Sequence, residues 1–103
     1  MIQNIKVILV EDVLQLSGFM TFNDVVVLLN ICIEKTSKLD VINVDLEKLS
    51  SSNSSVLIFI ISYIRSAMIN KQTIKFLNIP DLLIELSQVY NLNKIINYDE
   101  ENK

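Results

Sequence analysis

The sequence predicts an α/β fold in which a mixed β-sheet of about four strands is covered by about three to four helices. Two observations lead to this prediction. Short β-branched runs alternate along the chain with amphipathic stretches of about ten to seventeen residues, the pattern of strands and helices in turn. Half of the 103 residues are hydrophobic, 20% are charged, and there is one Gly and one Pro, so the chain is far too apolar to be disordered. Residues 1–103 are expected to form one domain.

The first two predicted elements form a hairpin. Ile5 to Val10 (IKVILV) is β-branched and is followed by Glu11 and Asp12, a strand and then a turn. Val13 to Leu16 alternates apolar and polar residues and leads to Gly18.

A helix is predicted next. Thr21 can cap it, and Asp24 stands where the second residue of a capping box belongs. The apolar run VVVLL is strand-like in composition, but the segment from Phe22 to about Lys35 is too long for an ordinary strand.

The second half continues the alternation. Val41 to Asp45 reads as a short buried strand, the polar residues 50–55 as a loop, and Ser54 to Asn70 as a helix. Thr73 to Ile79 reads as a strand, and Pro80 opens a final helix from Asp81 to about Tyr90. Residues 93–103 form a charged tail that is expected to fray.

Composition excludes several classes of function. The net charge is −3 and Arg65 is the only arginine among nine cations, so the basic stripe of a nucleic-acid-binding protein is missing. The chain has no His and a single Cys, which excludes the usual zinc sites and a hydrolase triad. Cys32 lies in an apolar run and is interpreted as a small core residue. No catalytic residue, metal or cofactor is therefore assigned.

The chain is expected to be cytoplasmic and to be covered in part by a partner. The apolar stretch at the start of the sequence is too short for a signal peptide. The longest apolar run, Val56 to Ile61, is far shorter than the roughly 20 residues that span a bilayer. Direct membrane insertion is not expected. A mean hydropathy of +0.41 is nevertheless high for a free monomer.

The helix from Ser54 to Asn70 has apolar residues on both sides. One side is an arc of roughly 140° that should face the sheet; its residues are Val56, Leu57, Ile60, Ile61, Ile64, Ala67 and Met68. The other side carries Ser62, Ser66 and Arg65 interleaved with Ile58, Phe59 and Ile69. Lys and Glu would be expected on a solvated face, so this side is interpreted as a protein interface. The alternative is that another segment of the same chain covers it.

Two polar groups near this helix have simpler interpretations. Asn53 or Ser54 can cap the helix, which accounts for part of the serine-rich segment. Asp45, at a strand end, is more often a structural hydrogen-bonding residue than a catalytic one. A Gly-rich phosphate loop is absent from the sequence.

The order of these segments resembles a STAS domain, the fold of anti-sigma-factor antagonists and of several transporter regulatory modules. The hairpin ends in LQLSG (residues 14–18), a buried strand closes on Asp45-Leu46, and a loop of small residues precedes a long helix. Among STAS domains the chain is most similar to MlaB, the cytoplasmic STAS subunit of the Mla ABC system for phospholipid transport. The segments LQLSGFMTFNDVVVLLN, DLEKLSSSNSSVL and LLIELSQVYNL carry this similarity.

The resemblance implies a role for Ser54. This residue stands at the position of the phosphorylatable Ser of the antagonists, which is a functional Thr in the Mla subunit. Asn53 replaces the Asp of the family and Val56 replaces its Gly, and both departures speak against a switch operated by a kinase.

The resulting hypothesis is a non-catalytic STAS subunit that binds and stabilises or regulates the ATPase of a Mla-type ABC phospholipid transporter, which maintains outer-membrane lipid asymmetry. It would lie at the inner membrane through an MlaF-like ATPase partner, and a homodimer of the isolated chain is left open. The residues assigned to partner binding are Ser54, Ser55, Ile58, Phe59, Ser62 and Arg65. The alternative is an anti-sigma-factor antagonist that is switched by phosphorylation of Ser54.

Overall fold

The computed structural model describes residues 4–51 and 55–81. Along these residues the elements are β1 (Ile5–Val10), β2 (Val13–Met20), the 3-10 turn η1 (Phe22–Asp24), α1 (Val25–Lys35), β3 (Val41–Ser51), α2 (Ser55–Ile69) and β4 (Thr73–Leu77). The predicted α/β class and four-stranded mixed sheet are confirmed. The described part contains two α-helices, where three to four were predicted for the whole chain. The helix predicted after Asp81 and the tail 93–103 lie outside the described residues.

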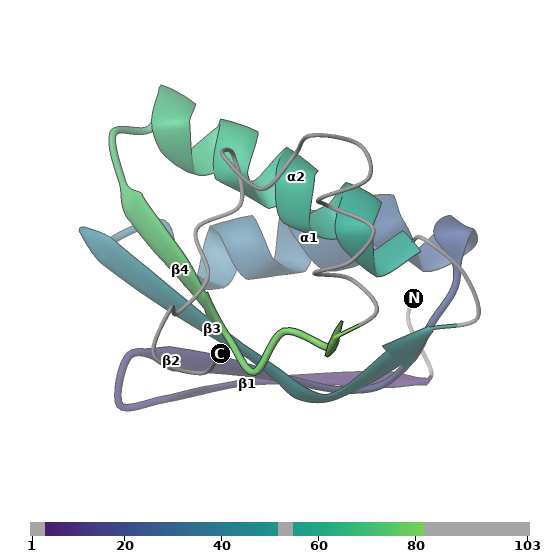
Figure 1. Cartoon of the computed structure of the whole chain (residues 1–103). Helices are drawn as coiled ribbons and strands as arrows, with labels where there is room; N and C mark the ends of the chain where they lie inside the picture. Colours follow the sequence, from purple (N-terminus) through teal and green to yellow (C-terminus); the bar gives the residue numbers. More distant parts are fainter. Residues whose placement is uncertain (1–3, 52–54, 82–103) are drawn as a thin grey trace.

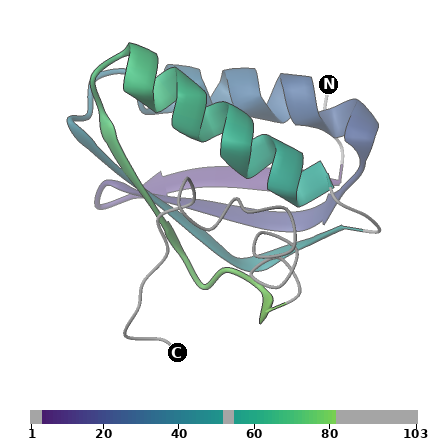
Figure 2. The same ribbon diagram turned by 45° about the horizontal axis from the view of Figure 1, so that its top comes forward.

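The strand order places both helices on one face of the sheet. The order is β1-β2-β3-β4, with β1 antiparallel to β2 and with β2, β3 and β4 parallel. Both crossovers, through α1 and through α2, step in the same direction, and right-handed crossovers of that kind leave their helices on the same face. Figures 1 and 2 show α1 and α2 together on one side of the sheet. Neither helix covers the opposite face.

The predicted hairpin is confirmed, but its second strand is longer than expected. Glu11 and Asp12 form the two-residue turn with φ of 51° and 66°, the left-handed values of a type I′ turn. Gly18 lies within β2 rather than after it, with φ of 115°. A Cβ atom at this position would stand 1.9 Å from the carbonyl oxygen of Asn4. Glycine at residue 18 therefore allows the start of β1 to approach β2 closely.

The start of α1 follows the capping-box prediction. The Asp24 carboxylate accepts hydrogen bonds from the Thr21 amide over 2.9 Å and from the Thr21 hydroxyl over 3.0 Å. The first turn is 3-10 and the helix is α from Val25 onward. Val25, Leu28 and Cys32 are buried at intervals of three and four residues, so the helical period decides the structure of this β-branched run.

The core lies between the sheet and the two helices. β2, β3 and β4 contribute alternate side chains, among them Leu14, Val44 and Phe76, and α2 contributes the largest share from any helix. β3 was predicted to end at Asp45 but continues to Ser51. The pairing of β2 with β3 shifts register between Gln15 and Ser17 and then continues to the end of β2. Because Met20, the last residue of β2, pairs with Ser51, β3 extends to Ser51.

Candidate functional site

One end of the molecule gathers the carboxyl ends of β2 and β3 and the amino ends of α1 and α2. This is the right-hand end in Figure 1. In open sheets with parallel strands, binding sites lie preferentially beyond the carboxyl ends of the strands. The described part of the serine-rich segment also lies at this end, with Ser50 and Ser51 closing β3 and Ser55 opening α2.

Three serines of the predicted loop belong to regular elements of the structure. Ser50 and Ser51 belong to β3, and the Ser50 hydroxyl donates to the Gly18 carbonyl over 3.2 Å. Ser55 is the first residue of α2; it is fully buried, and its hydroxyl donates to the Met20 carbonyl over 3.3 Å. Ser55 therefore joins α2 to the end of β2, and the prediction that it binds a partner is wrong. Ser54 lies outside the described residues.

The outward face of α2 keeps three of the predicted partner-binding residues. The Ile58 side chain is 44% exposed, Ser62 is half-buried and Arg65 is exposed. These residues follow one another at intervals of four and three, so they form one stripe along the helix. Arg65 is the only charged residue of α2 and makes no ion pair within the described part of the chain.

Phe59 is not part of this stripe. Its side chain is 0% exposed and belongs to the core, so its assignment as an interface anchor is wrong. The Phe59 ring packs edge-on against Tyr63 with the ring centroids 5.7 Å apart. Because α2 packs against α1 as well as against the sheet, it buries an arc of about 200° at 100° per residue, which is wider than the arc that a sheet alone would cover.

The far end of the stripe is more apolar than predicted. Met68 was expected to face the sheet but is largely exposed, and Ile69 beside it is 80% exposed. Because the buried arc of α2 is turned toward α1, the opposite edge of the helix, which carries Met68, faces outward. We call Ile58, Ser62, Arg65, Met68 and Ile69 the α2 outer face. It presents large apolar groups around one guanidinium.

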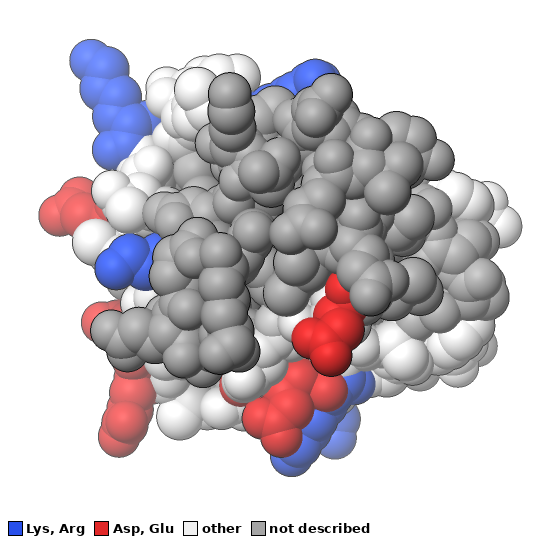
Figure 3. All heavy atoms as spheres, in the orientation of Figure 1, with Lys and Arg blue, Asp and Glu red and all other residues white. Residues whose placement is uncertain are grey.

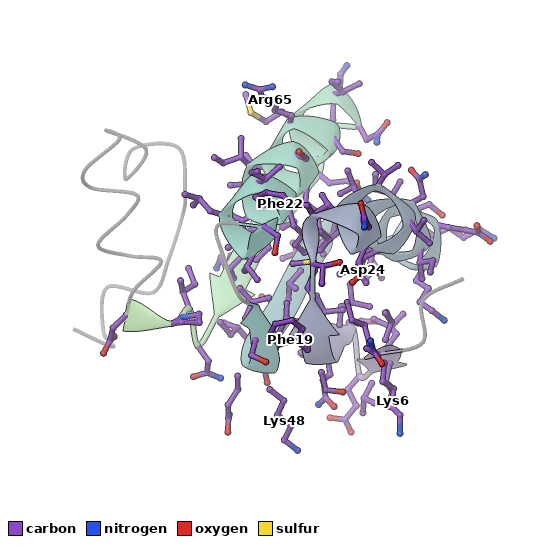
Figure 4. The ribbon with its side chains drawn as sticks, turned by 90° about the vertical axis from the view of Figure 1, so that its right-hand side faces the viewer. Lys6, Phe19, Phe22, Asp24, Lys48 and Arg65 are labelled. Atoms are coloured by element: carbon purple, nitrogen blue, oxygen red, sulfur yellow. The ribbon has the colours of Figure 1, made fainter. Side chains whose placement is uncertain are left out.

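Two exposed aromatic residues at the same end were missed in the sequence. Phe19 is near the end of β2 on the helix-free face, and Phe22 begins the turn before α1. Both side chains are exposed, and Figure 4 shows them at the end of the molecule where α2 begins, with Arg65 farther along α2. Aromatic residues are enriched in protein interfaces. The signal available in the sequence was FMTF, two phenylalanines beside the predicted cap Thr21.

The helix-free face of the sheet carries a hollow lined mainly by polar and charged residues, unlike the apolar α2 outer face. This hollow of about 460 Å³ is lined by Lys6, Ile8, Gln15, Leu16, Ser17, Asp45, Glu47 and Lys48. Lys6 and Lys48 point away from the helices in Figure 4. The Asn78 amide donates to Asp45 over 3.0 Å and to Glu47 over 3.4 Å. Asp45 is thus a structural hydrogen-bonding residue, as its position at the predicted strand end indicated.

The described residues offer little for covalent or metal chemistry. Burial raises the pKa of the Cys32 thiol to about 12, so the thiol is protonated at neutral pH. Within residues 4–51 and 55–81, no three His, Cys, Asp or Glu side chains gather as metal ligands would. Figure 3 shows basic and acidic side chains next to one another along the margins of this face. No helix in the described ranges is long and apolar enough to cross a bilayer.

Comparisons with known proteins identify the fold. No family model matches the chain, and no curated protein matches it by sequence. Among solved structures it is similar to the anti-sigma factor antagonist SpoIIAA in its unphosphorylated form, with a TM-score of 0.66, 16% identity, and coverage of 95% of this chain and 90% of that one. It is also similar to the phosphorylated form of SpoIIAA, described as a Bacillus cell fate determinant, with a TM-score of 0.60, 13% identity, and coverage of 95% and 93%.

A third solved structure, the protein TM1081, matches with a TM-score of 0.70, 14% identity, and coverage of 90% of this chain and 78% of that one. At such identities the likeness concerns the fold. The chain therefore has a STAS-like α/β fold, as the sequence resemblance implied.

Proposed function

We propose that the chain is a non-catalytic protein-binding subunit that docks a partner protein through the α2 outer face. The observation that carries this proposal is the composition of that face. Ile58, Met68 and Ile69 are exposed on a helix whose only charged residue is Arg65. Apolar groups around one arginine are typical of interface centres rather than of a solvated helix.

The partner that we propose is the ATPase subunit of a Mla-type ABC phospholipid transporter. The order and spacing of three sequence segments that resemble those of MlaB support this choice. The partner surface would be an apolar groove with a carboxylate placed to pair with Arg65. Full burial of one large side chain such as Ile58 contributes roughly 1.5 to 3 kcal/mol, so a few such contacts give a stable complex. ATP would be bound and hydrolysed by the partner, and this chain would lie at the inner membrane only through it.

Anti-sigma-factor antagonism is the second candidate, favoured by the likeness to both forms of SpoIIAA. In this case the partner is an anti-sigma protein, and phosphorylation of Ser54 would release it. The first turn of α2 contains no acidic residue, so a phosphate close to this helix start would meet no like charge from that turn. Val56 argues against this candidate. At the corresponding position the antagonists have a Gly in a tight turn, whereas Val56 is a buried residue of α2.

One pair of measurements separates the candidates. The purified chain is mixed with a Mla-type ATPase and, separately, with a kinase-type anti-sigma factor and ATP, and complex formation is followed by size-exclusion chromatography. The first candidate predicts a stable complex with the ATPase and no change in mass with the kinase. The second predicts a complex with the anti-sigma factor and a gain of one phosphoryl group, lost in Ser54→Ala. If neither protein binds, both partner assignments are wrong.

A further inference from the structure

β1 is an edge strand with an unusually apolar free side. Among the strands of residues 4–51 and 55–81, it pairs on one side only, with β2. The exposed fractions of Ile8, Leu9 and Val10 are 43%, 37% and 44%, and Lys6 is the only charged residue of the strand. Edge strands of natural proteins are usually protected by charges, prolines or bulges, because their open backbone groups attract other strands.

The register with β2 shows which backbone groups of β1 are open. Bonded and non-bonded residues alternate along an antiparallel pair. The two-residue turn makes Val10 and Val13 a hydrogen-bonded pair, and the bond from the Phe19 amide to the Asn4 carbonyl, 3.1 Å long, fits the same alternation. The N–H and C=O groups of Ile5, Val7 and Leu9 therefore point to the free edge.

We propose that this edge binds β1 of a second copy of the chain, so that two four-stranded sheets join across a twofold axis. The strands run antiparallel with Ile8 opposite Ile8. Val7 of each copy then lies opposite Leu9 of the other, and both residues have open backbone groups. Each such pair exchanges two hydrogen bonds, so the two pairs give about four.

The side chains of β1 favour a second copy as the occupant. In this register Lys6 lies opposite Val10 of the second copy, next to the hairpin turn that carries Glu11 and Asp12. Opposite charges therefore lie near one another at both ends of the interface, and no like charges are directly opposed. Ile8 lies on the twofold axis and contacts its own counterpart on the helix-free face.

The interface is separate from the α2 outer face. β1 and β4 are the two edges of the described sheet, and α2 connects β3 to β4, away from β1. Self-association through β1 therefore leaves the proposed partner surface free. The inference does not rest on the proposed function and can be tested in the absence of any partner.

The test uses charge at the residue on the twofold axis. Sedimentation equilibrium of the full chain should show a monomer–dimer equilibrium, and Ile8→Lys and Ile8→Glu should each weaken it by about tenfold or more, because like charges then face each other. An equimolar mixture of the two variants should form a heterodimer. Ile8 is exposed, so both variants should keep the wild-type circular dichroism spectrum.

Thr73→Lys on β4, the other edge of the described sheet, is the matched control and should dimerise like the wild type. The proposal is overturned if the wild type stays monomeric at high concentration or if the single Ile8 variants dimerise normally. It is equally overturned if the mixture of variants remains monomeric, or if Thr73→Lys abolishes the dimer.

Discussion

The phenol oxygen of Tyr63 on α2 lies 3.0 Å from the carbonyl oxygen of Cys32 on α1. The Thr36 hydroxyl, just beyond α1, lies 2.7 Å from the same carbonyl and is hydrogen-bonded to the Tyr63 hydroxyl. The hydroxyl groups of Tyr63 and Thr36 and the Cys32 carbonyl thus make three short contacts with one another. Only two hydroxyl protons are available for these three contacts. Gln72 extends the connection, since its amide donates to the carbonyls of Thr36 over 2.9 Å and Leu39 over 2.7 Å. These bonds fix the end of α1 against α2 and the start of β4.

Removing the Tyr63 hydroxyl should weaken the hydrogen bonding between α1 and α2 without leaving a cavity in the core. Tyr63→Phe keeps the ring that packs against Phe59 and Phe76. The Cys32 carbonyl keeps the Thr36 hydroxyl as a donor, so the expected loss is about 1 kcal/mol of unfolding free energy, or a melting temperature lower by about 4–8 °C. Thermal unfolding followed by circular dichroism measures it, with Ser37→Ala on the exposed surface as control. An unchanged melting temperature would contradict the account.

Alkaline pH should destabilise the fold through Cys32. Burial raises the pKa of its thiol from 9.0 in the unfolded chain to about 12 in the fold, and the nearby Lys35 opposes this rise. Burial also raises the pKa of the Tyr63 phenol. At pH values between 9 and 12 the unfolded thiol loses its proton while the folded thiol keeps it. The unfolding free energy therefore falls as pH rises through that window, by an amount on the order of 1 kcal/mol per pH unit.

Urea unfolding of the wild type and of Cys32→Ala, between about pH 8 and pH 11, isolates the contribution of the thiol. Lysines and other groups also titrate there, so the difference between the two proteins is the quantity of interest. The wild type should lose stability more steeply. Parallel pH profiles would show that the thiol does not titrate as its burial requires.

Gly18 should not tolerate a side chain. Its φ of 115° is unfavourable for other residues, and a Cβ atom would collide with the Asn4 carbonyl oxygen. Gly18→Ala should cost roughly 1–3 kcal/mol from the backbone strain alone. Ser17→Ala, at the neighbouring half-exposed position, should change stability by less than about 0.5 kcal/mol. Equal melting temperatures for the two variants would mean that β1 can shift away from β2 at no cost.

The sequence predicts much of this fold because local signals agree with it. The capping box at Thr21 and Asp24 set the start of the first helix despite the β-branched VVVLL. The alternation of strands and helices was sufficient to predict a mixed sheet. The end of β3 could not be predicted, because Ser50 and Ser51 are held by pairing with β2, a partner distant in sequence.

The site was predicted less well than the fold, for a geometric reason. The periodicity of α2 shows two apolar sides but not where the neighbouring helix lies. Because α1 packs beside α2, Phe59 is buried and Met68 is exposed, the reverse of the prediction. Phe19 and Phe22 are three residues apart, so the sequence alone places them together, but it does not show that both side chains are exposed.

The most direct test of the docking surface compares two adjacent residues of α2. Ile58→Asp changes the outer face, whereas Phe59→Asp places a charge in the core. We expect Ile58→Asp to keep the wild-type circular dichroism spectrum and to lose binding to the Mla-type ATPase in surface plasmon resonance, whereas Phe59→Asp should unfold. Wild-type partner affinity in a folded Ile58→Asp variant would contradict the assignment of the α2 outer face as the docking surface.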